Sequence, residues 1–197
     1  SGDTVKALKE INIQSITCSL ETINNDLFSM AKPGDSLEER KKLLETCERE
    51  GVSIRSMIMI GLGETYEDRI RHLFYLKGFS RLYHVRFSRF YPYPGTAYSN
   101  HPRCSPWELA RTVAVARLIM PNVNLGLAAG NTHDDLPLWH LAGGGSQLLG
   151  AGVSNPRRHS KSAPGQQIIP VTEEVFVVNN MPLMRQYMEG MGCHRFI

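Results

Sequence analysis

Apolar positions recur along this chain with two different spacings. Short runs rich in β-branched and aromatic residues predict strands, whereas apolar positions three to four residues apart predict helices. Strands are expected over 14–20, 52–60, 83–90, 123–128 and 147–149, and helices over 3–10, 36–51, 65–77, 105–120, 134–142 and 180–190. The segment 153–170 carries three prolines and is expected to form an irregular loop.

Three of these helices begin with recognisable capping residues. Ser36 precedes Glu39 by three residues, which predicts a capping box. Thr65 is placed to cap the next helix, and Asp68 suits the positive end of that helix. Ser105 is followed by a proline, which is favoured at the first helical position. The predicted helices therefore have defined starting points.

The elements follow one another as strand–helix units, repeated about four times along the chain. Such repetition implies an α/β fold with a parallel sheet and right-handed crossovers. An open doubly wound sheet and a β/α barrel both fit this pattern. In either fold, ligands bind at the carboxyl ends of the strands. The unusual segments of the chain fall at that edge, namely Glu21, 61–64, 91–96 and 130–133.

The loop after the second strand reads Gly61-Leu62-Gly63-Glu64. Its two glycines allow a tight turn and a close approach of the backbone to a ligand. Taken alone, such residues more often form an ordinary turn between a strand and a helix. The sequence leaves both interpretations open, including a phosphate held by this loop.

Composition and charge exclude several classes of function. The chain has 197 residues, 42% hydrophobic and 21% charged, which is typical of one globular domain. A formal net charge of +3 is too small to argue for a nucleic-acid partner. No apolar run approaches the ~20 residues that span a bilayer, so no membrane partner is expected. The first residue is not Met, which suggests a fragment or a processed chain.

The four cysteines are widely spaced, and no Cys-x-x-Cys pair occurs. This spacing argues against a zinc or iron–sulfur site held by this chain alone. Isolated cysteines fit a reducing cytoplasm better than a disulfide framework, so a cytoplasmic location is expected.

Several segments, taken in order, resemble the C-terminal half of radical S-adenosylmethionine (SAM) enzymes of the biotin synthase family. The family includes biotin synthase, the [FeFe]-hydrogenase maturase, methylornithine synthase and the maturase of the iron-guanylylpyridinol cofactor. The similarity covers about residues 4–152 and is carried by 19–22, 36–40, 59–65, 94–96 and 111–121. It implies that 1–152 form the C-terminal half of a TIM-like β/α barrel, with 153–197 as an extension packing on it.

The resemblance also implies a reaction and its cofactors. Enzymes of this family cleave SAM reductively to a 5′-deoxyadenosyl radical, which abstracts hydrogen from a substrate inside the barrel. Their first half carries Cys-x3-Cys-x2-Cys or a near variant, which holds a [4Fe–4S] cluster. That motif is absent here. The cluster is therefore expected in the full-length enzyme, on a missing N-terminal half-barrel, and not on this chain.

The resemblance assigns five residues to SAM. Glu21 would hold the ribose or amino group, with Ser19 beside it in the same motif. Arg40 would pair with the carboxylate, a task suited to a planar and always-charged side chain. Met59 and Leu62 would lie against the adenine. Without the resemblance, Glu21 reads as a surface residue at a helix entry, and Arg40 as an i,i+4 partner of acidic neighbours on its own helix.

Strand alternation suggests where a substrate would bind. If Met59 points into the barrel, then Arg55 does too, and Arg86 and Ser88 point inward from the next strand. Two inward arginines are costly unless paired. Their partner is either a carboxylate, from Glu21 or the missing half, or an anionic small-molecule substrate.

The loop over 130–133 adds Asn131 and His133 to the candidate substrate residues, although a histidine in such a loop is more often a loop or capping residue than a catalyst. Two positions differ from biotin synthase itself. Arg55 stands where that enzyme has a cysteine ligand of its second cluster, and Gly126 stands where it has an arginine ligand. The comparison points to a relative without that sulfur-donating cluster.

The interpretation is a SAM- and substrate-binding half of a radical enzyme in cofactor or amino-acid biosynthesis. It is an enzyme if the chain is part of a longer one. Two alternatives remain open: a non-catalytic β/α binding module, and an unrelated β/α-barrel metabolic enzyme that binds a phosphate at the loop Gly61–Glu64.

A first prediction concerns iron. Anaerobic reconstitution of this chain with iron and sulfide is expected to leave no [4Fe–4S] cluster bound, because no three of its cysteines have suitable spacing. Iron analysis and visible absorbance measure the result. A stoichiometric cluster with its broad charge-transfer absorbance would contradict the prediction.

Overall fold

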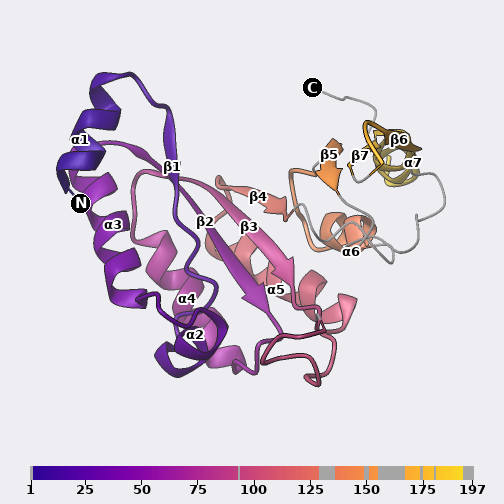
Figure 1. Cartoon of the computed structure of the whole chain (residues 1–197), viewed down its shortest axis with the longest axis horizontal. Coiled ribbons are helices and arrows are strands. Elements are labelled where there is room, and N and C mark those ends of the chain that lie inside the picture. The colour runs from indigo at the N-terminus through magenta and orange to yellow at the C-terminus, as the bar shows by residue number, and fades with distance from the viewer. Residues whose placement is uncertain are drawn as a thin grey trace.

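The computed structural model describes residues 2–92, 94–128, 136–148, 151–154, 167–173, 175–179 and 181–192. The elements of Figure 1 are α1 (Gly2–Glu10), β1 (Ser15–Thr17), α2 (Asn25–Ala31), α3 (Leu37–Glu50), β2 (Ser53–Ile60), α4 (Tyr66–Lys77), β3 (Leu82–Arg89), α5 (Pro106–Ile119), β4 (Asn124–Leu127), α6 (Leu136–Ala142), β5 (Ala151–Ser154), β6 (Gln167–Pro170), β7 (Phe176–Asn179) and α7 (Met181–Gly190).

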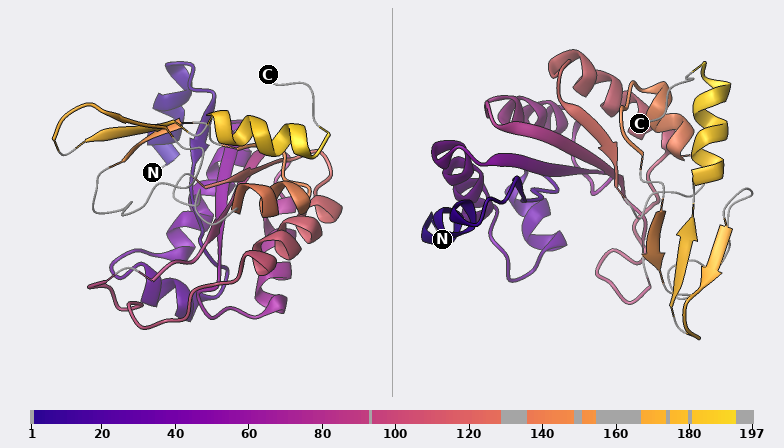
Figure 2. Two further views of the ribbon diagram at one scale, coloured as in Figure 1. Left: turned by 90° about the vertical axis from the view of Figure 1, so that its right-hand side faces the viewer. Right: turned by 90° about the horizontal axis from the view of Figure 1, so that it is seen from above.

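A parallel sheet with the strand order β1-β2-β3-β4 organises the first part of the chain. Each strand pairs in parallel with the next, as the repeated strand–helix units predict. Figure 2 shows the strands as a curved layer with α3, α4 and α5 along one side. The loops that follow β1, β2 and β3 lie at one edge of this sheet, where α2 also lies (Figure 1).

Strand β2 shows why the two faces of the sheet differ. Its side chains alternate strictly between buried and half-buried positions. Ile54, Ile58 and Ile60 face the helices and belong to the hydrophobic core. Met57 and Met59 lie on the opposite, inner face. Because successive side chains point to opposite faces of a sheet, the predicted parity of this strand is confirmed.

The predicted helix starts form with one difference. Thr65 and Asp68 make a full capping box, in which the Thr65 N–H donates to the Asp68 carboxylate at 3.0 Å. Ser36 caps its helix by accepting the Glu39 N–H at 3.3 Å. The reciprocal half of that box is absent, because the Ser36 N–H donates to Asp35 at 2.7 Å. The predicted capping box at Ser36 is therefore only half formed.

The segment before α3 is where the prediction is least accurate. Regular strand is confined to Ser15–Thr17, yet the chain stays beside β2 through hydrogen bonds at Cys18 and Glu21. Helix α2 was not predicted. Its signal was Asn24, whose side chain accepts the N–H groups of two residues in the first turn, while Phe28 anchors the helix in the core.

The C-terminal part contains a second, antiparallel sheet with the strand order β5-β7-β6 (Figure 2). The expected irregular loop over 153–170 is therefore wrong at both of its ends, which form β5 and β6. Pro170 misled the prediction, although proline is tolerated at the end of an edge strand. Of the strand expected over 147–149, one bridge from Gln147 to Gly126 is seen, and Leu149 lies outside the described residues. The division at residue 152 stays a prediction.

Two further features complete the fold. Helix α7 begins where the sequence predicted a last helix, and it contacts α6. Within the described part of the chain, no helix combines the length and the apolar character needed to cross a membrane.

The cap of α4 leads to a prediction. Thr65→Ala is expected to lower the free energy of unfolding by about 1 kcal/mol, because an N–H group at the helix start loses its partner. Chemical denaturation at pH 7 measures the change. Thr46→Ala is the matched control, since Thr46 is a half-buried threonine within α3 and caps no helix.

The same cap predicts a pH dependence. Hydrogen bonding from Thr65 holds the pKa of Asp68 below its usual range. The stabilisation is therefore present above the unfolded-state pKa, about 3.9, and is lost as pH falls through the lower folded-state value. The destabilisation by Asp68→Asn should shrink as the pH falls below about 4. A constant difference between pH 7 and pH 2.5 would contradict this assignment.

Candidate functional site

A cavity of about 420 Å³ opens at the carboxyl edge of the parallel sheet. It is lined by Glu21, Ala31, Lys32, Met57, Met59, Leu62, Ser88, Arg89, Phe90, Tyr91, Thr96, Tyr98 and Ala128. These residues come from the ends of β2 and β3, from α2 and from the loops beyond the strands. The structure thus brings Glu21, Met59 and Leu62 of the predicted SAM set to one cavity, together with Ser88 of the predicted substrate set.

Glu21 is the most unusual residue of this cavity. It is only 2% exposed, and its φ of 61° is rare for a residue other than glycine. Backbone hydrogen bonds to Met57 and Met59 hold it in this conformation beside β2. The reading of Glu21 as a surface residue is therefore wrong.

The two carboxylate oxygens of Glu21 have different surroundings. Oε1 pairs with Lys32 Nζ at 3.1 Å, whereas Oε2 is buried and accepts no hydrogen bond. A buried acceptor without a donor costs about 1–3 kcal/mol. The geometry suits a ligand that supplies a hydroxyl or ammonium donor to Oε2. Lys32 was missed by the sequence analysis because it follows the unpredicted helix α2.

Arg40 does not line the cavity. Its Nε donates to Asp35 Oδ2 at 3.0 Å, its Nη2 pairs with the same oxygen at 2.5 Å, and its Nη1 donates to the carbonyl of Ser19. Hydrogen bonding from Arg40 lowers the pKa of Asp35. The alternative partner, an acidic neighbour on its own helix, is not observed; Asp35 precedes that helix. Ser19 enters this site through its backbone.

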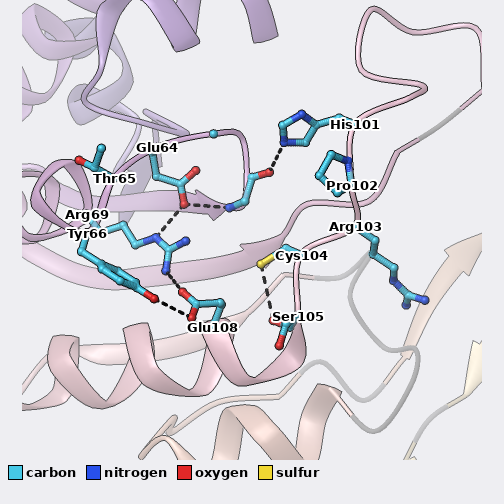
Figure 3. Close-up of a pocket in the computed structure, with 12 residues that line it drawn as sticks. Glu64, Thr65, Tyr66, Arg69, His101, Pro102, Arg103, Cys104, Ser105 and Glu108 are labelled. Atoms are coloured by element: carbon cyan, nitrogen blue, oxygen red, sulfur yellow. Dashed lines mark hydrogen bonds and ion pairs between the residues drawn. The ribbon is translucent and has the colours of Figure 1, made fainter.

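The loop Gly61–Glu64 borders a second cavity of about 550 Å³ (Figure 3). The Glu64 carboxylate accepts the N–H of Gly61 at 2.8 Å and that of Leu62 at 2.7 Å. His101 Nε2 lies 3.0 Å from the Gly61 carbonyl oxygen. Because a carboxylate of the chain already accepts from these amide donors, a phosphate could bind them only by displacing Glu64.

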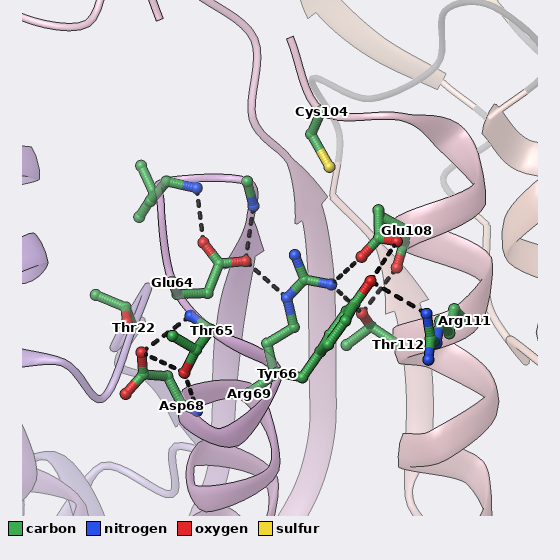
Figure 4. A network of polar contacts seen from close by, with 12 residues as sticks. Thr22, Glu64, Thr65, Tyr66, Asp68, Arg69, Cys104, Glu108, Arg111 and Thr112 are labelled. Atoms are coloured by element: carbon green, nitrogen blue, oxygen red, sulfur yellow. Dashed lines mark hydrogen bonds and ion pairs between the residues drawn. The ribbon is translucent and has the colours of Figure 1, made fainter. Parts of the chain in front are cut away.

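Glu64 belongs to a network of hydrogen bonds and ion pairs that joins the loop to α4 and α5 (Figure 4). Arg69, 8% exposed, donates to Glu64 at 2.7 Å and to Glu108 at 2.5 Å. Tyr66 donates to Glu108 at 2.9 Å and accepts from Arg111 at 3.1 Å. Burial acts to raise the pKa of Glu108, but hydrogen bonds from Arg69 and Tyr66 lower it on balance. The sequence analysis missed this network because its members lie on two helices.

The inner face below the first cavity carries the predicted arginines. Arg55 pairs in register with His84, and Arg86 pairs with Met57. The Arg55 guanidinium lies 5.3 Å from the centre of the Tyr83 ring. Among the described residues, neither arginine forms an ion pair with a carboxylate.

Two other sequence observations can be placed. A Cβ added at Gly126 would lie 2.2 Å from His84 Nε2, so no larger side chain fits there unless His84 moves. Asn131 and His133 lie outside the described residues. Within the described ranges, no group of three histidine, cysteine or acidic side chains forms a metal site.

Comparisons with known proteins agree with this geometry. The family described as the radical SAM superfamily matches residues 2–76, and the biotin and thiamin synthesis associated domain matches residues 87–149. The chain is a biotin synthase-like radical SAM protein. Its α/β fold class is confirmed, with the parallel sheet as part of a radical SAM barrel.

Three similar proteins illustrate this membership. An uncharacterized protein of Methanocaldococcus jannaschii is 37% identical over 163 residues, 83% of this chain and 43% of that protein. Biotin synthase of Carboxydothermus hydrogenoformans is 30% identical over 146 residues, 73% of this chain and 44% of the enzyme. The crystal structure of methylornithine synthase (PylB) superposes with a TM-score of 0.63 at 22% identity, over 75% of this chain and 44% of that one.

The radical SAM protein thus spans less than half the length of these curated relatives. The alternative of an unrelated β/α enzyme is contradicted by the same matches.

The loop of this radical SAM protein provides a test of packing. Gly61 has a φ of 98°, and a Cβ there would lie 2.4 Å from Cys104 Cβ. Gly61→Ala is expected to lower the free energy of unfolding by about 2–4 kcal/mol, from backbone strain and overpacking together.

Gly34→Ala is the matched control for this variant. Gly34 has a φ of 85°, but no atom lies within 4 Å of the added Cβ. It should cost only the backbone strain, about 1–2 kcal/mol. Equal losses in the two variants, measured by chemical denaturation, would show that contact with Cys104 does not matter.

Proposed function

We propose that this chain is the SAM- and substrate-binding half of a radical SAM enzyme in cofactor or amino-acid biosynthesis, with SAM held in the 420 Å³ cavity at the carboxyl edge. One observation carries the proposal: a buried Glu21 oxygen without a hydrogen-bond donor, in a cavity that Met59 and Leu62 also line. Family membership supports the reaction class.

The residues of the cavity fit the parts of SAM. Glu21 Oε2 would accept a hydrogen bond from a ribose hydroxyl or from the amino group, while Oε1 stays paired with Lys32. Met59 and Leu62 offer apolar surface to the adenine. Arg40 would bind the SAM carboxylate only by sharing or leaving Asp35, so in the structure as it stands it orients the Ser19–Glu21 segment.

When bound to a [4Fe–4S] cluster and reduced, SAM supplies the 5′-deoxyadenosyl radical that abstracts hydrogen from a substrate. The described cysteines do not fit such a cluster. Cys18, Cys47 and Cys104 are buried in the hydrophobic core, and within the described residues they are not part of any group of three side chains that could hold a metal. We therefore assign the cluster ligands to the portion of the enzyme that corresponds to the rest of its relatives.

On the inner face, Arg55, Arg86 and Ser88 would contact the substrate, with Asn131 and His133 as further candidates from the rim. This chain would orient the substrate below SAM and exclude water from it. A non-catalytic binding module would share the cavity but form no 5′-deoxyadenosine, so turnover of SAM under reducing conditions separates the two functions.

Calorimetric titration of the intact protein with SAM tests the proposal. Glu21→Ala should weaken SAM binding by about 1.5–3 kcal/mol, because a hydrogen bond to a charged acceptor is lost. Glu38→Ala is the control, since Glu38 is an exposed carboxylate on α3 paired with a lysine. Unchanged affinity in Glu21→Ala, or no binding by the wild type, would contradict the proposed site.

The role of Arg40 is separated by a pair of variants. If Arg40 binds the SAM carboxylate directly, Arg40→Ala should weaken binding, while Asp35→Ala should leave it equal or tighter by releasing the guanidinium. If Arg40 only orients the Ser19–Glu21 segment, both variants should weaken binding to a similar degree.

A further inference from the structure

The inner face of the sheet carries three levels of paired residues, one below another. Met59 and Ser88 form the upper pair and both line the cavity. Met57 lines the cavity too, and its partner is Arg86. Arg55 and His84 form the third pair, further from the carboxyl edge. Arg86 and Arg55 do not line the cavity, but they follow its lining residues on the same face of the sheet, one and two levels below Met59 and Ser88.

His84 on β3 fills the space that a side chain at Gly126 of β4 would otherwise occupy. His84 is 3% exposed, and its imidazole occupies the volume left by the absent side chain of Gly126, the register partner of Arg86. His84 Nε2 is buried and has no hydrogen-bond partner. A bulkier residue at 126 would exclude this arrangement.

The electrostatics of this region are one-sided. Arg55 Nε is also buried without a hydrogen-bond partner. Burial, followed by the charges of Arg86, Arg55 and His140, lowers the pKa of His84 to about 4. None of the described ion pairs brings a carboxylate to Arg55 or Arg86. Arg55 and Arg86 are half-buried, and the described part of the chain supplies them with no carboxylate. An anionic group bound between them would pair with both guanidinium groups.

We propose that Arg55, Arg86 and His84 form a binding site for an anionic oxygen group, a carboxylate or a phosphate, at the far end of the substrate. Arginine binds both groups through two parallel N–H donors, and a neutral imidazole adds one more. The identification of this ligand as the substrate rests on the proposed function; the anion site itself does not.

The strand geometry also sets the length of that substrate. A step of two residues along a strand spans about 7 Å. Arg86 lies one such step below Ser88, and Arg55 lies two steps below Met59. The anionic group is therefore expected about 7–13 Å from the part of the substrate beside SAM.

The test uses the intact protein and three probes of equal chain length: hexanoate, hexyl phosphate and the neutral hexanamide. Binding is followed by NMR through the His84 ring signals. Hexanoate, hexyl phosphate or both should bind saturably and shift these signals, and hexanamide should not. The better of the two anions identifies the headgroup.

Arginine variants show whether the predicted residues are responsible. Arg55→Met and Arg86→Met should each weaken anion binding at least tenfold, while Arg86→Lys should retain part of the affinity. Arg71→Met is the matched control, because this substitution removes the same charge from an exposed position on α4. It should change the affinity less than twofold. Thermal denaturation verifies that each variant is folded.

Two results would overturn the anion site. One is equal binding of hexanoate, hexyl phosphate and hexanamide, or anion binding that neither arginine variant weakens. The other is a structure of the intact protein with an aspartate or glutamate within 4 Å of both guanidinium groups. Parallel calorimetry with SAM separates the two proposals: SAM binding without anion binding rejects only the anion site, and anion binding without SAM binding rejects only the proposed function.

Discussion

The geometry of the edge at which the strands end depends on the hydrogen bonds and the ion pair of the Glu64 side chain. Its carboxylate accepts two consecutive N–H groups from the turn after β2 and holds Arg69, which in turn holds Glu108 on α5. These charges are largely buried, so each needs its partner. Losing one member of such a pair typically costs about 3–5 kcal/mol. One side chain therefore sets the turn, the start of α4 and the position of α5 together.

The buried carboxylates of Glu64 and Glu21 differ in whether the protein supplies all of their hydrogen-bond donors. Glu64 is fully supplied with donors, and the same residues that supply it fasten the loop. Glu21 is equally buried but has a donor for only one oxygen, and its backbone adopts an unfavourable conformation. Buried groups left unsatisfied in a strained segment are more common at ligand sites than in a core. The two glutamates follow neighbouring strands, yet only Glu21 is poised for a ligand.

The arginines of the protein differ in the same way, by whether the chain supplies a carboxylate partner. Arg69 is buried between two carboxylates, whereas Arg55 and Arg86 project from the sheet with none among the described residues. Gly126 allows His84 to lie beside them. In this radical SAM protein, the hydrophobic core lies on the helix side of the sheet. The unpaired polar groups lie on the side that a complete barrel would enclose.

The sequence by itself determined the alternation of strands and helices, the parity of β2 and the candidate residues Glu21, Met59 and Leu62 at one edge. The alternation and the parity depend on local periodicity and on capping, which neighbouring residues encode. The three candidate residues were assigned by the family resemblance. Short elements held by distant partners were missed or misjudged. Helix α2 is stabilised by burying Phe28, and β5 and β6 exist because β7 pairs with both.

Only the tertiary structure decided which polar groups are satisfied. Arg40, Arg69 and Arg55 are alike as letters, but the first pairs with Asp35, the second with two glutamates, and the third with no carboxylate of the described chain. The free energy of a buried charge depends on the few atoms within hydrogen-bond reach. Those atoms come from segments far apart in the chain, so the folded arrangement alone distinguishes a structural ion pair from a side chain that awaits a ligand.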